Sequence, residues 1–327
     1  MLELVDRLIQ CRNEKQDIVL VCIMESSGSL PRKKGACMLV GNKGRIAGTV
    51  GGGNLEYQAT SYAMKLFMTD SPHRLSENAG YSILPYELNL GDSANLGMVC
   101  GGRAKLLFYP IYWDDGYLNR WISEWKSALE NGKEHQLLFY DLKGKNRQKE
   151  SLPENVPIIH RETIYGDGIV YIFGAGHLAL EVVPLLAHLD FRCVVLDDRE
   201  EFANPNCFPE AKEVKLVDFR NLSQEIQPME NDYLVIMTRG HRWDLYAEAF
   251  GLHTEAAYIG VVGSRKKTAF VNGQLRDMGF SEEDIGRIIT PIGVEIGSET
   301  PEEIAVSIVA QLIEVRSKKR RKLREIN

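Results

Sequence analysis

The chain has 327 residues, of which 44% are hydrophobic and 26% charged, a composition typical of folded domains rather than disordered segments. Its 39 basic and 45 acidic side chains give a formal charge of −6, which argues against nucleic-acid binding over a broad surface. No run approaches the ~18 uncharged apolar residues of a membrane span. The cysteines form no CxxC pair and the amino terminus lacks the apolar core of a secretory signal, so we expect a cytoplasmic protein without disulfide staples.

The first part of the chain alternates short extended segments with turns. The predicted strands are residues 17–24, 36–40, 45–50, 96–110 and 135–142. Three glycines at 51–53 precede apolar residues at helical spacing, so they stand at a strand-to-helix junction. A further helix is predicted over 121–132. This pattern predicts a mixed α+β domain over residues 1–145.

A polar stretch over residues 146–167, with Pro153 and Pro157, has the composition of a linker. Beyond it, near-continuous apolar strands alternate with helices from residue 168 to residue 327. Strands of this kind are buried on both faces of a parallel sheet that helices cover on both sides. We therefore predict an α/β chain in which a Rossmann-like, doubly wound parallel-sheet domain follows the mixed α+β domain.

The sharpest nucleotide-type signal is a G-x-G-x-x-A pattern, formed by Gly174, Gly176 and Ala179 between an apolar strand and a helix. His177 opens that helix, and Asp197 lies about twenty residues further on, where an acceptor for a ribose hydroxyl is expected. NAD(P) is therefore a candidate cofactor, and a carboxylate at this position should favour NAD(H) over NADP(H). The alternative is that the glycines only form a close turn in a scaffold without a ligand.

A second glycine-rich loop contains Gly51, Gly52 and Gly53. Consecutive glycines before a helix allow several backbone N–H groups to converge on an anion, and the helix dipole adds to the attraction. Arg32 follows the first predicted strand in the segment GSLPR and is a cation that can meet the same anion. The alternatives are a tight turn that needs positive φ angles and a solvated arginine.

Other candidate residues lie beside glycines or at strand ends. Cys100 is flanked by small residues, and a soft thiolate suits a metal such as molybdenum; the alternative is a small packed residue. His241 follows one predicted strand of the second domain, and Ser264 and Arg265 follow another. A doubly wound sheet binds ligands at such strand ends, although ordinary loop polarity would give the same residues.

Together these motifs resemble the XdhC/CoxI family over nearly the whole chain. GSLPRKKGACMLV, GTVGGGNLE and LGMVCGG are similar to its amino-terminal signature, and YIFGAGHLA, VLDDRE, TRGHRWD and YIGVVGSRKK to its carboxy-terminal Rossmann domain. The resemblance implies a cytoplasmic accessory protein, usually a homodimer, that binds molybdenum cofactor (molybdopterin) while a cysteine desulfurase assists its sulfuration. Such a protein delivers the cofactor to a molybdenum hydroxylase such as xanthine dehydrogenase, and we expect a carrier rather than an enzyme.

The resemblance also implies particular contacts. Carried over by position, the cofactor contacts are Pro31, Arg32, Gly51 to Gly53, Glu56 and the set Gly174, Gly176 and Asp197, with Cys100 at the metal. Asn54 stands where many relatives have a cysteine, which leaves Cys100 as the best sulfur ligand. Two other classes remain open. One is an NAD(P)-dependent oxidoreductase in which His241 is the general acid and Asp244 its orienter, and the other is a nucleotide-sensing regulatory protein.

Overall fold

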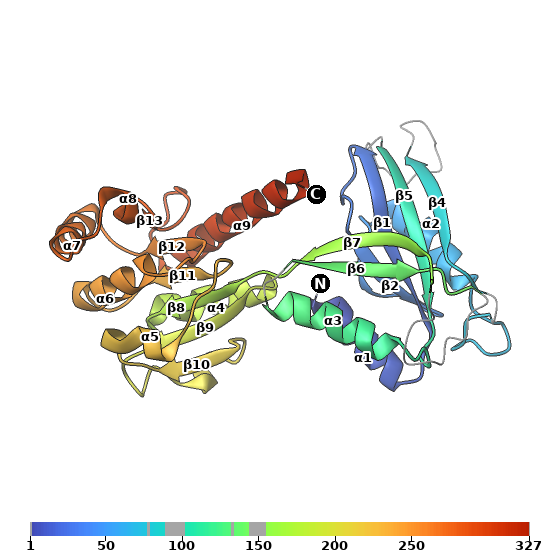
Figure 1. Cartoon of the computed structure of the whole chain (residues 1–327), viewed down its shortest axis with the longest axis horizontal. Helices are drawn as coiled ribbons and strands as arrows, with labels where there is room; N and C mark the ends of the chain where they lie inside the picture. The colour runs from blue at the N-terminus through green and yellow to red at the C-terminus, as the bar shows by residue number, and fades with distance from the viewer. Residues whose placement is uncertain (1, 77–78, 89–101, 132–133, 144–154, 327) are drawn as a thin grey trace. The chain divides into compact units, whose positions relative to one another are not determined.

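The computed structural model describes residues 2–76, 79–88, 102–131, 134–143 and 155–326 (Figure 1). The chain forms two compact units, which we describe one by one. Unit 1 comprises residues 1–129 and 134–164, and unit 2 comprises residues 130–133 and 165–327. Within the described ranges, no helix combines the length and the apolar character needed to cross a membrane.

Unit 1 is built on a five-stranded antiparallel sheet with the strand order β3-β2-β1-β5-β4. The strands are β1 (Ile18–Gly28), β2 (Cys37–Gly41), β3 (Gly44–Gly48), β4 (Ser82–Leu88) and β5 (Gly102–Ile111). The helices are α1 (Leu2–Asn13), α2 (Gly53–Met64) and α3 (Leu118–Asn131), and a second, two-stranded sheet contains β6 (Glu134–Tyr140) and β7 (Ile158–Tyr165). β7 lies within the range 146–167 that the sequence predicted to be a linker.

The central strand of unit 1 is buried on both faces, because successive side chains of a strand point to opposite sides. Leu20 and Cys22 of β1 pack in one cluster with α1, α3, β6 and β7. Val19 and Val21 pack in a second cluster with α2. The sheet therefore separates two hydrophobic layers, and β3 leads from it directly into the glycine-rich loop and α2 (Figure 1).

Unit 2 is built on a six-stranded parallel sheet with the order β10-β9-β8-β11-β12-β13. Its strands are β8 (Ile169–Phe173), β9 (Arg192–Asp197), β10 (Glu213–Leu216), β11 (Tyr233–Ile236), β12 (Tyr258–Val261) and β13 (Ile288–Ile289). Counted along the chain this is the order 3-2-1-4-5-6 of a dinucleotide-binding Rossmann sheet. The predicted fold class is therefore confirmed for this unit, and the order reverses between β8 and β11.

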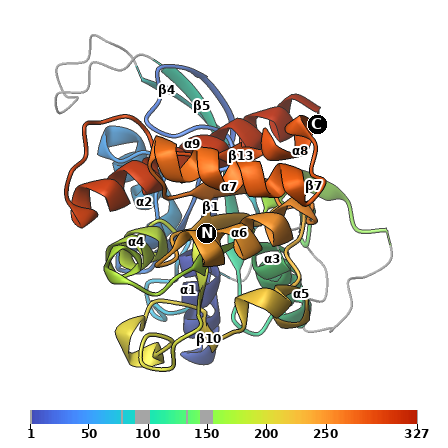
Figure 2. The ribbon, with the colours of Figure 1, turned by 90° about the vertical axis from the view of Figure 1, so that its left-hand side faces the viewer.

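Helices cover both faces of the parallel sheet. They are α4 (His177–His188), α5 (Leu222–Glu225), α6 (His241–Leu252), α7 (Arg265–Asp277), α8 (Glu282–Ile285) and α9 (Pro301–Ile326), with short 3₁₀ turns η1 (Pro205–Cys207) and η2 (Phe219–Asn221). α4 and α9 pack in one hydrophobic cluster, and α5 to α8 in the other. Figure 2 looks onto this unit and shows α6 and α7 side by side. In α9, Arg316 and Arg320 lie 3.3 Å and 2.7 Å from the Asp167 carboxylate, which ties this helix to the start of the unit.

The structure contradicts the expectation of a chain without disulfides. Cys22 of β1 and Cys37 of β2 are joined by a disulfide bond, and their Cα atoms lie 4.2 Å apart. The two residues face each other in the antiparallel register of β1 and β2. Spacing along the sequence gave no sign of this pair, because only the strand register brings the two sulfurs together.

Buried Asp17 connects three segments of unit 1. Its carboxylate accepts hydrogen bonds from the backbone N–H of Leu75 at 2.8 Å and of Trp113 at 3.0 Å, and it lies 3.4 Å from Arg74. Burial raises the pKa of this carboxyl, while the two backbone hydrogen bonds and Arg74 act in the opposite direction. Asp17 therefore satisfies main-chain donors that would otherwise be buried without partners.

We predict that Asp17→Ala lowers the free energy of unfolding of unit 1 by roughly 2 to 4 kcal/mol, because it leaves two buried N–H groups unsatisfied. Asp114→Ala is the matched control, since Asp114 contacts the same Arg74 at 3.3 Å but is partly exposed. The free energy of unfolding of both variants is measured by urea unfolding, with hydrogen exchange of unit 1 peptides as the readout. Equal losses in the two variants would contradict the role given to Asp17.

A second prediction concerns Glu248 of α6, which is buried near Asp244 and Lys267. Burial, reinforced by the negative charge of Asp244 and opposed by Lys267, raises the pKa of Glu248 to about 8. A carboxyl whose pKa is higher in the folded state than in the unfolded state stabilises the fold at low pH, and this contribution is lost as the pH rises toward 8. Glu248→Gln should therefore be more stable than the parent above pH 8, by roughly 1 to 3 kcal/mol.

Urea unfolding of unit 2 between pH 5 and pH 9, resolved by peptide hydrogen exchange, tests this expectation. The parent should lose stability across this range, whereas Glu248→Gln should show a flatter profile. The exposed Glu255, changed to Gln, is the control and should follow the parent. Parallel profiles for parent and Glu248→Gln would show that Glu248 does not take up a proton on folding.

Candidate functional site

The glycine-rich loop of unit 1 requires its three glycines. Gly51, Gly52 and Gly53 have φ angles of 125°, 71° and 58°, and α2 begins at Gly53. Residues with a Cβ rarely adopt positive φ angles, so the run of glycines follows from the backbone path. The helix start adds N–H groups that have no acceptor within the helix, as at every helix N-terminus.

Glu56 occupies part of this loop with its own carboxylate. One oxygen, Oε2, accepts hydrogen bonds from the backbone N–H of Val50 at 3.2 Å and of Gly52 at 3.1 Å, and from the hydroxyl of Thr49. The other oxygen lies 3.3 Å from Nε of Arg45. Glu56 is thus an internal anion that holds the loop, and its predicted contact with a cofactor stays a prediction.

Pro31 and Arg32 lie against the same loop. A Cβ placed on Gly51 would lie 3.4 Å from Cβ of Pro31 and 3.5 Å from the backbone nitrogen of Arg32. A Cβ on Gly52 would meet no atom within 4 Å, so this glycine borders open space. Arg32 is exposed. The structure thus brings together the five residues Pro31, Arg32 and Gly51 to Gly53 that the sequence predicted for one site.

The predicted metal contact, Cys100, lies outside the described residues, and its role stays a prediction. Gly102, two residues further on, begins β5 and pairs with Gly28 at the end of β1. A Cβ on Gly102 would lie 2.9 Å from Cγ of Leu30, next to Pro31 in the sequence. Among the residues that the structure describes, no group of three or more His, Cys, Asp or Glu side chains could hold a metal ion.

The glycine turn of unit 2 lies at the point where the strand order reverses. Gly174 has a φ of 109° and donates a backbone hydrogen bond to the carbonyl of Leu196 at 2.7 Å. A Cβ here would lie 2.6 Å from the carbonyl oxygen of Met237, just after β11, so only glycine fits. Gly176 precedes α4, which begins at His177, and a Cβ there would meet nothing within 4 Å. The turn leaves open space at a helix N-terminus, which is a suitable place for a phosphate.

Asp197 is already engaged by the protein. Its Oδ2 accepts hydrogen bonds from the N–H of Ala175 at 2.8 Å and from Nη2 of Arg199 at 2.9 Å. Its Oδ1 accepts from the backbone nitrogen of Arg199 at 3.0 Å and from its Nε at 2.8 Å. Burial opposes ionisation of Asp197, but the hydrogen bonds from Arg199 and Ala175 outweigh it and lower the pKa. Because Arg199 neutralises this carboxylate, the argument that its charge repels the 2′-phosphate of NADP(H) no longer holds.

The other predicted residues of unit 2 lie where helices begin after β11 and β12. His241 is the first residue of α6, and its ring contacts Phe270 edge-on with centroids 5.3 Å apart. Ser264 caps α7 by accepting a hydrogen bond from the backbone N–H of Lys267 at 3.3 Å. Arg265 is the exposed first residue of that helix. All three follow the carboxyl ends of parallel strands, as the sequence indicated.

Asp244 does not act as an orienter of His241. It is fully buried, accepts a hydrogen bond from the hydroxyl of Thr238 at 2.6 Å and forms an ion pair with Lys267. The acid and orienter pair of the oxidoreductase hypothesis is therefore not formed. Sequence reasoning missed Arg199 and Lys267, although both stand inside motifs that it had singled out. Arg199 binds Asp197, only two residues away, whereas the ion pair of Lys267 with Asp244 becomes visible only when the ends of β11 and β12 are placed side by side.

Comparison with protein families agrees with this architecture. The model described as the XdhC and CoxI family matches residues 11–76, which include β1 to β3, the glycine-rich loop and α2. The model described as the XdhC Rossmann domain matches residues 170–312, which include nearly all of the parallel sheet. The chain belongs to the XdhC and CoxI family. Both candidate sites of this XdhC-type chain lie within the matched ranges, except for the segment around Cys100.

Two curated relatives cover most of the chain. Uncharacterized protein YqeB of Escherichia coli (strain K12) is 25% identical over 299 residues, which make up 90% of this chain and 43% of that protein. The chain thus spans less than half of the E. coli relative. A probable xanthine dehydrogenase subunit of Bacillus subtilis (strain 168) is 24% identical over an alignment covering 93% of this chain and 95% of that protein.

A solved structure shares the fold. The crystal structure of a xanthine dehydrogenase from Bacillus halodurans is similar to this chain with a TM-score of 0.76 and 24% sequence identity. The similarity covers 96% of each chain. At this identity the comparison establishes the fold of the XdhC-type chain alone. Its chemistry has to be argued from the residues of the candidate sites.

The bond between Asp197 and Ala175 generates a prediction for the Rossmann turn. Asp197→Asn weakens the Arg199 ion pair and the hydrogen bond that closes the turn, so amide exchange over residues 174–178 should accelerate roughly tenfold. Asp198→Asn is the control, because Asp198 forms ion pairs with the side chains of Arg199 and Arg239, at 3.9 Å and 3.4 Å, rather than a bond to the turn. Hydrogen-exchange mass spectrometry measures both. An unchanged turn in Asp197→Asn would mean that the glycines alone maintain its shape.

Proposed function

We propose that the chain acts in the maturation of a molybdenum hydroxylase such as xanthine dehydrogenase, by binding molybdenum cofactor in unit 1 and delivering it to that enzyme. Membership of the XdhC and CoxI family supports this proposal, as does the name of the B. subtilis relative, a probable subunit of xanthine dehydrogenase. The proposed partners are the target hydroxylase, a cysteine desulfurase and a second copy of the chain.

One observation carries the proposal: an exposed arginine and an open glycine lie together at the start of a helix. Pro31 and Arg32 lie against Gly51, while Gly52 borders open space before α2. Backbone N–H groups, the positive end of a helix and a guanidinium all favour a phosphate. The phosphate of molybdopterin is an anion of the required kind, and a side chain on Gly52 would fill the space that it needs.

Each residue has a defined task in this proposal. Without cargo, Glu56 keeps the loop in shape by accepting hydrogen bonds from Val50 and Gly52. In the proposed complex the phosphate replaces the carboxylate at these N–H groups, and Arg32 adds positive charge. Cys100 is proposed as the sulfur contact to the metal end of the cargo, because thiolates suit soft metal centres. The cargo supplies the metal chemistry only after delivery, so the chain itself acts as a carrier rather than as a catalyst.

A nucleotide in unit 2 is the second candidate function. The strand order 3-2-1-4-5-6 places an open glycine turn at the switch point, where Rossmann domains bind dinucleotides. Gly176, at the N-terminus of α4, is the position nearest to an incoming phosphate in such a complex. A regulatory nucleotide fits these features better than a hydride-transfer cofactor, because Asp244 is bound to Thr238 and Lys267 and does not support His241.

The carrier proposal predicts that Gly52→Val loses bound pterin by at least tenfold in protein purified from a host that makes molybdenum cofactor. The valine would fill the open space beside the helix start and would strain a φ of 71°. Gly44→Val is the matched control, since Gly44 also has a positive φ, 122°, and open surroundings, but is the first residue of β3, right after the turn that follows β2.

Acid oxidation of the purified proteins and fluorescence of the released pterin measure retention, and activation of a cofactor-free hydroxylase measures delivery. Circular dichroism confirms that each variant is folded. Full pterin retention in soluble Gly52→Val would move the binding site away from the loop. A parent protein that neither retains pterin nor activates the hydroxylase would overturn the carrier function itself.

A further inference from the structure

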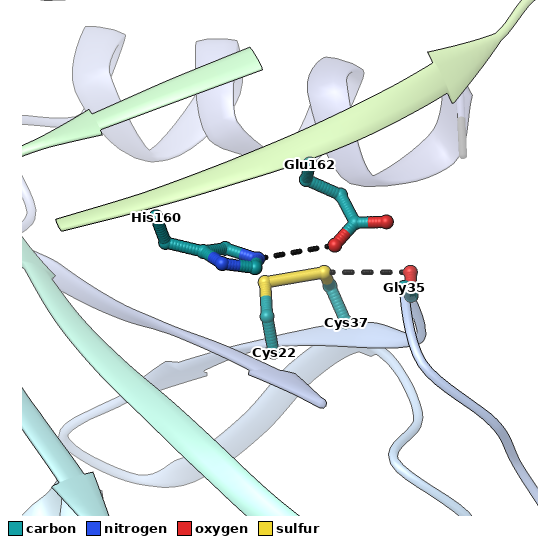
Figure 3. The surroundings of a disulfide bond; sticks show 5 residues. All are labelled: Cys22, Gly35, Cys37, His160 and Glu162. Carbon is teal, nitrogen blue, oxygen red and sulfur yellow. Dashed lines mark hydrogen bonds and ion pairs between the residues drawn. A yellow bond between two sulfur atoms is a disulfide. The ribbon is translucent and has the colours of Figure 1, made fainter. Parts of the chain in front are cut away.

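A buried histidine and glutamate lie beside the disulfide of unit 1. His160 and Glu162 are two residues apart on β7, so their side chains leave the strand on the same side. Nε2 of His160 lies 3.1 Å from Oε2 of Glu162, and their side chains are only 9% and 11% exposed. Figure 3 shows this pair next to the bond between Cys22 and Cys37.

Gly35 lies close both to the disulfide and to the pair of His160 and Glu162. Its carbonyl oxygen lies 3.7 Å from Sγ of Cys37, and a Cβ on Gly35 would lie 2.7 Å from Oε1 of Glu162. A side chain at Gly35 would therefore push the carboxylate away from this position, and the φ of 89° also favours glycine here. When Cys37 carries a proton, the same carbonyl is in place to accept a hydrogen bond from its thiol.

A purely structural disulfide has no use for such a pair. Burying polar and ionisable groups is costly, and apolar side chains would cover two sulfurs at a lower cost. Cys193 in unit 2 shows the other situation: burial alone raises the pKa of its thiol to about 12, and no polar partner is associated with it. Thiols become exchangeable when a base stands next to them, which is the arrangement around Cys22 and Cys37.

We propose that Cys22 and Cys37 form a reversible dithiol–disulfide site that exchanges with low-molecular-weight thiols, with His160 as its proton carrier and Glu162 as the positioning residue. The contact with Glu162 assigns the ring N–H to Nε2, which leaves Nδ1 of His160 as the proton acceptor. Glu162 also stabilises the imidazolium that forms during exchange. The site differs from the glycine-rich loop and needs no cargo.

The exchange consumes two thiol molecules. His160 takes the proton of the first, and the resulting thiolate attacks Sγ of Cys37, which at 6% exposed is more accessible than Cys22. A new S–S bond forms to Cys37, the bond between Cys37 and Cys22 breaks, and Cys22 leaves with the electron pair and takes the proton from His160. A second thiol attacks the outer sulfur in the same way. The products are two protein thiols and one small-molecule disulfide, and the protein gains two electrons and two protons.

The site controls how one segment is anchored. Cys22 and Cys37 are 15 residues apart, and the segment between them carries Pro31 and Arg32. The disulfide ties both ends of this segment to the sheet. Backbone hydrogen bonds between Ile23 and its partners Gly35 and Ala36, each of 2.9 Å, keep the strands paired when the disulfide is reduced. Exchange therefore changes a covalent link without unfolding unit 1.

The test uses the full chain equilibrated in mixtures of reduced and oxidised glutathione. Free thiols are trapped with N-ethylmaleimide, and mass spectrometry of peptides follows Cys22 and Cys37 separately from the other cysteines. The two residues should change together in one reversible transition. At a fixed concentration of oxidised glutathione, the ratio of reduced to oxidised protein should rise as the square of the reduced glutathione concentration. A pair that stays reduced at every ratio of reduced to oxidised glutathione, or that is reduced only in denaturant, would overturn the proposal.

Kinetics distinguish proton transfer from packing. His160→Asn and Glu162→Gln should slow the approach to equilibrium on the order of tenfold or more while the midpoint changes little, and added imidazole should restore the rate of His160→Asn. The matched control is His188→Asn, which removes an exposed imidazole from unit 2. An unchanged rate in folded His160→Asn would also overturn the proposal, because the histidine would then only fill space.

Discussion

Carboxylates that accept hydrogen bonds from main-chain N–H groups maintain the shape of both candidate sites. Glu56 accepts such bonds from Val50 and Gly52 in unit 1, and Asp197 accepts one from Ala175 in unit 2. A loop of glycines has no side chains with which to hold itself, so its donors need an acceptor supplied from elsewhere. In both units the acceptor comes from the neighbouring regular element, a helix in one case and a strand end in the other.

The sequence predicted the architecture well, because periodicity along the chain reports burial. It identified the parallel domain and the strand-to-helix position of both glycine turns. It did not identify β7, because Pro157 and several charges in that stretch indicate a linker. The observed strand is buried on one side only, at Ile164 among other residues. A strand that is buried on one side only gives a weak apolar pattern in the sequence when its exposed side is as polar as a loop.

Contacts between distant residues were beyond sequence reasoning. The motifs singled out Glu56 and Asp197, yet a motif does not say whether a carboxylate faces a ligand or the protein's own backbone. The disulfide partners and the ion pair of Asp244 with Lys267 depend on strand register and on which strand ends are neighbours. Arg316 belongs to a mostly basic stretch of α9, yet its side chain is mostly buried beside Asp167 and Phe191.

The position of Glu56 has a consequence for selectivity. Because Glu56 is fixed in α2 next to the loop, an anion that binds the loop under the carrier proposal has to compete with its carboxylate. The effective concentration of that carboxylate is not lowered by dilution and is on the order of millimolar or above. A small free anion such as inorganic phosphate has to displace it with a few hydrogen bonds and one charge. A large ligand brings further contacts along its length, which offset the cost of that displacement. Under the carrier proposal, the carboxylate of Glu56 is thus a built-in competitor that favours a large phosphate-bearing ligand over a small free anion.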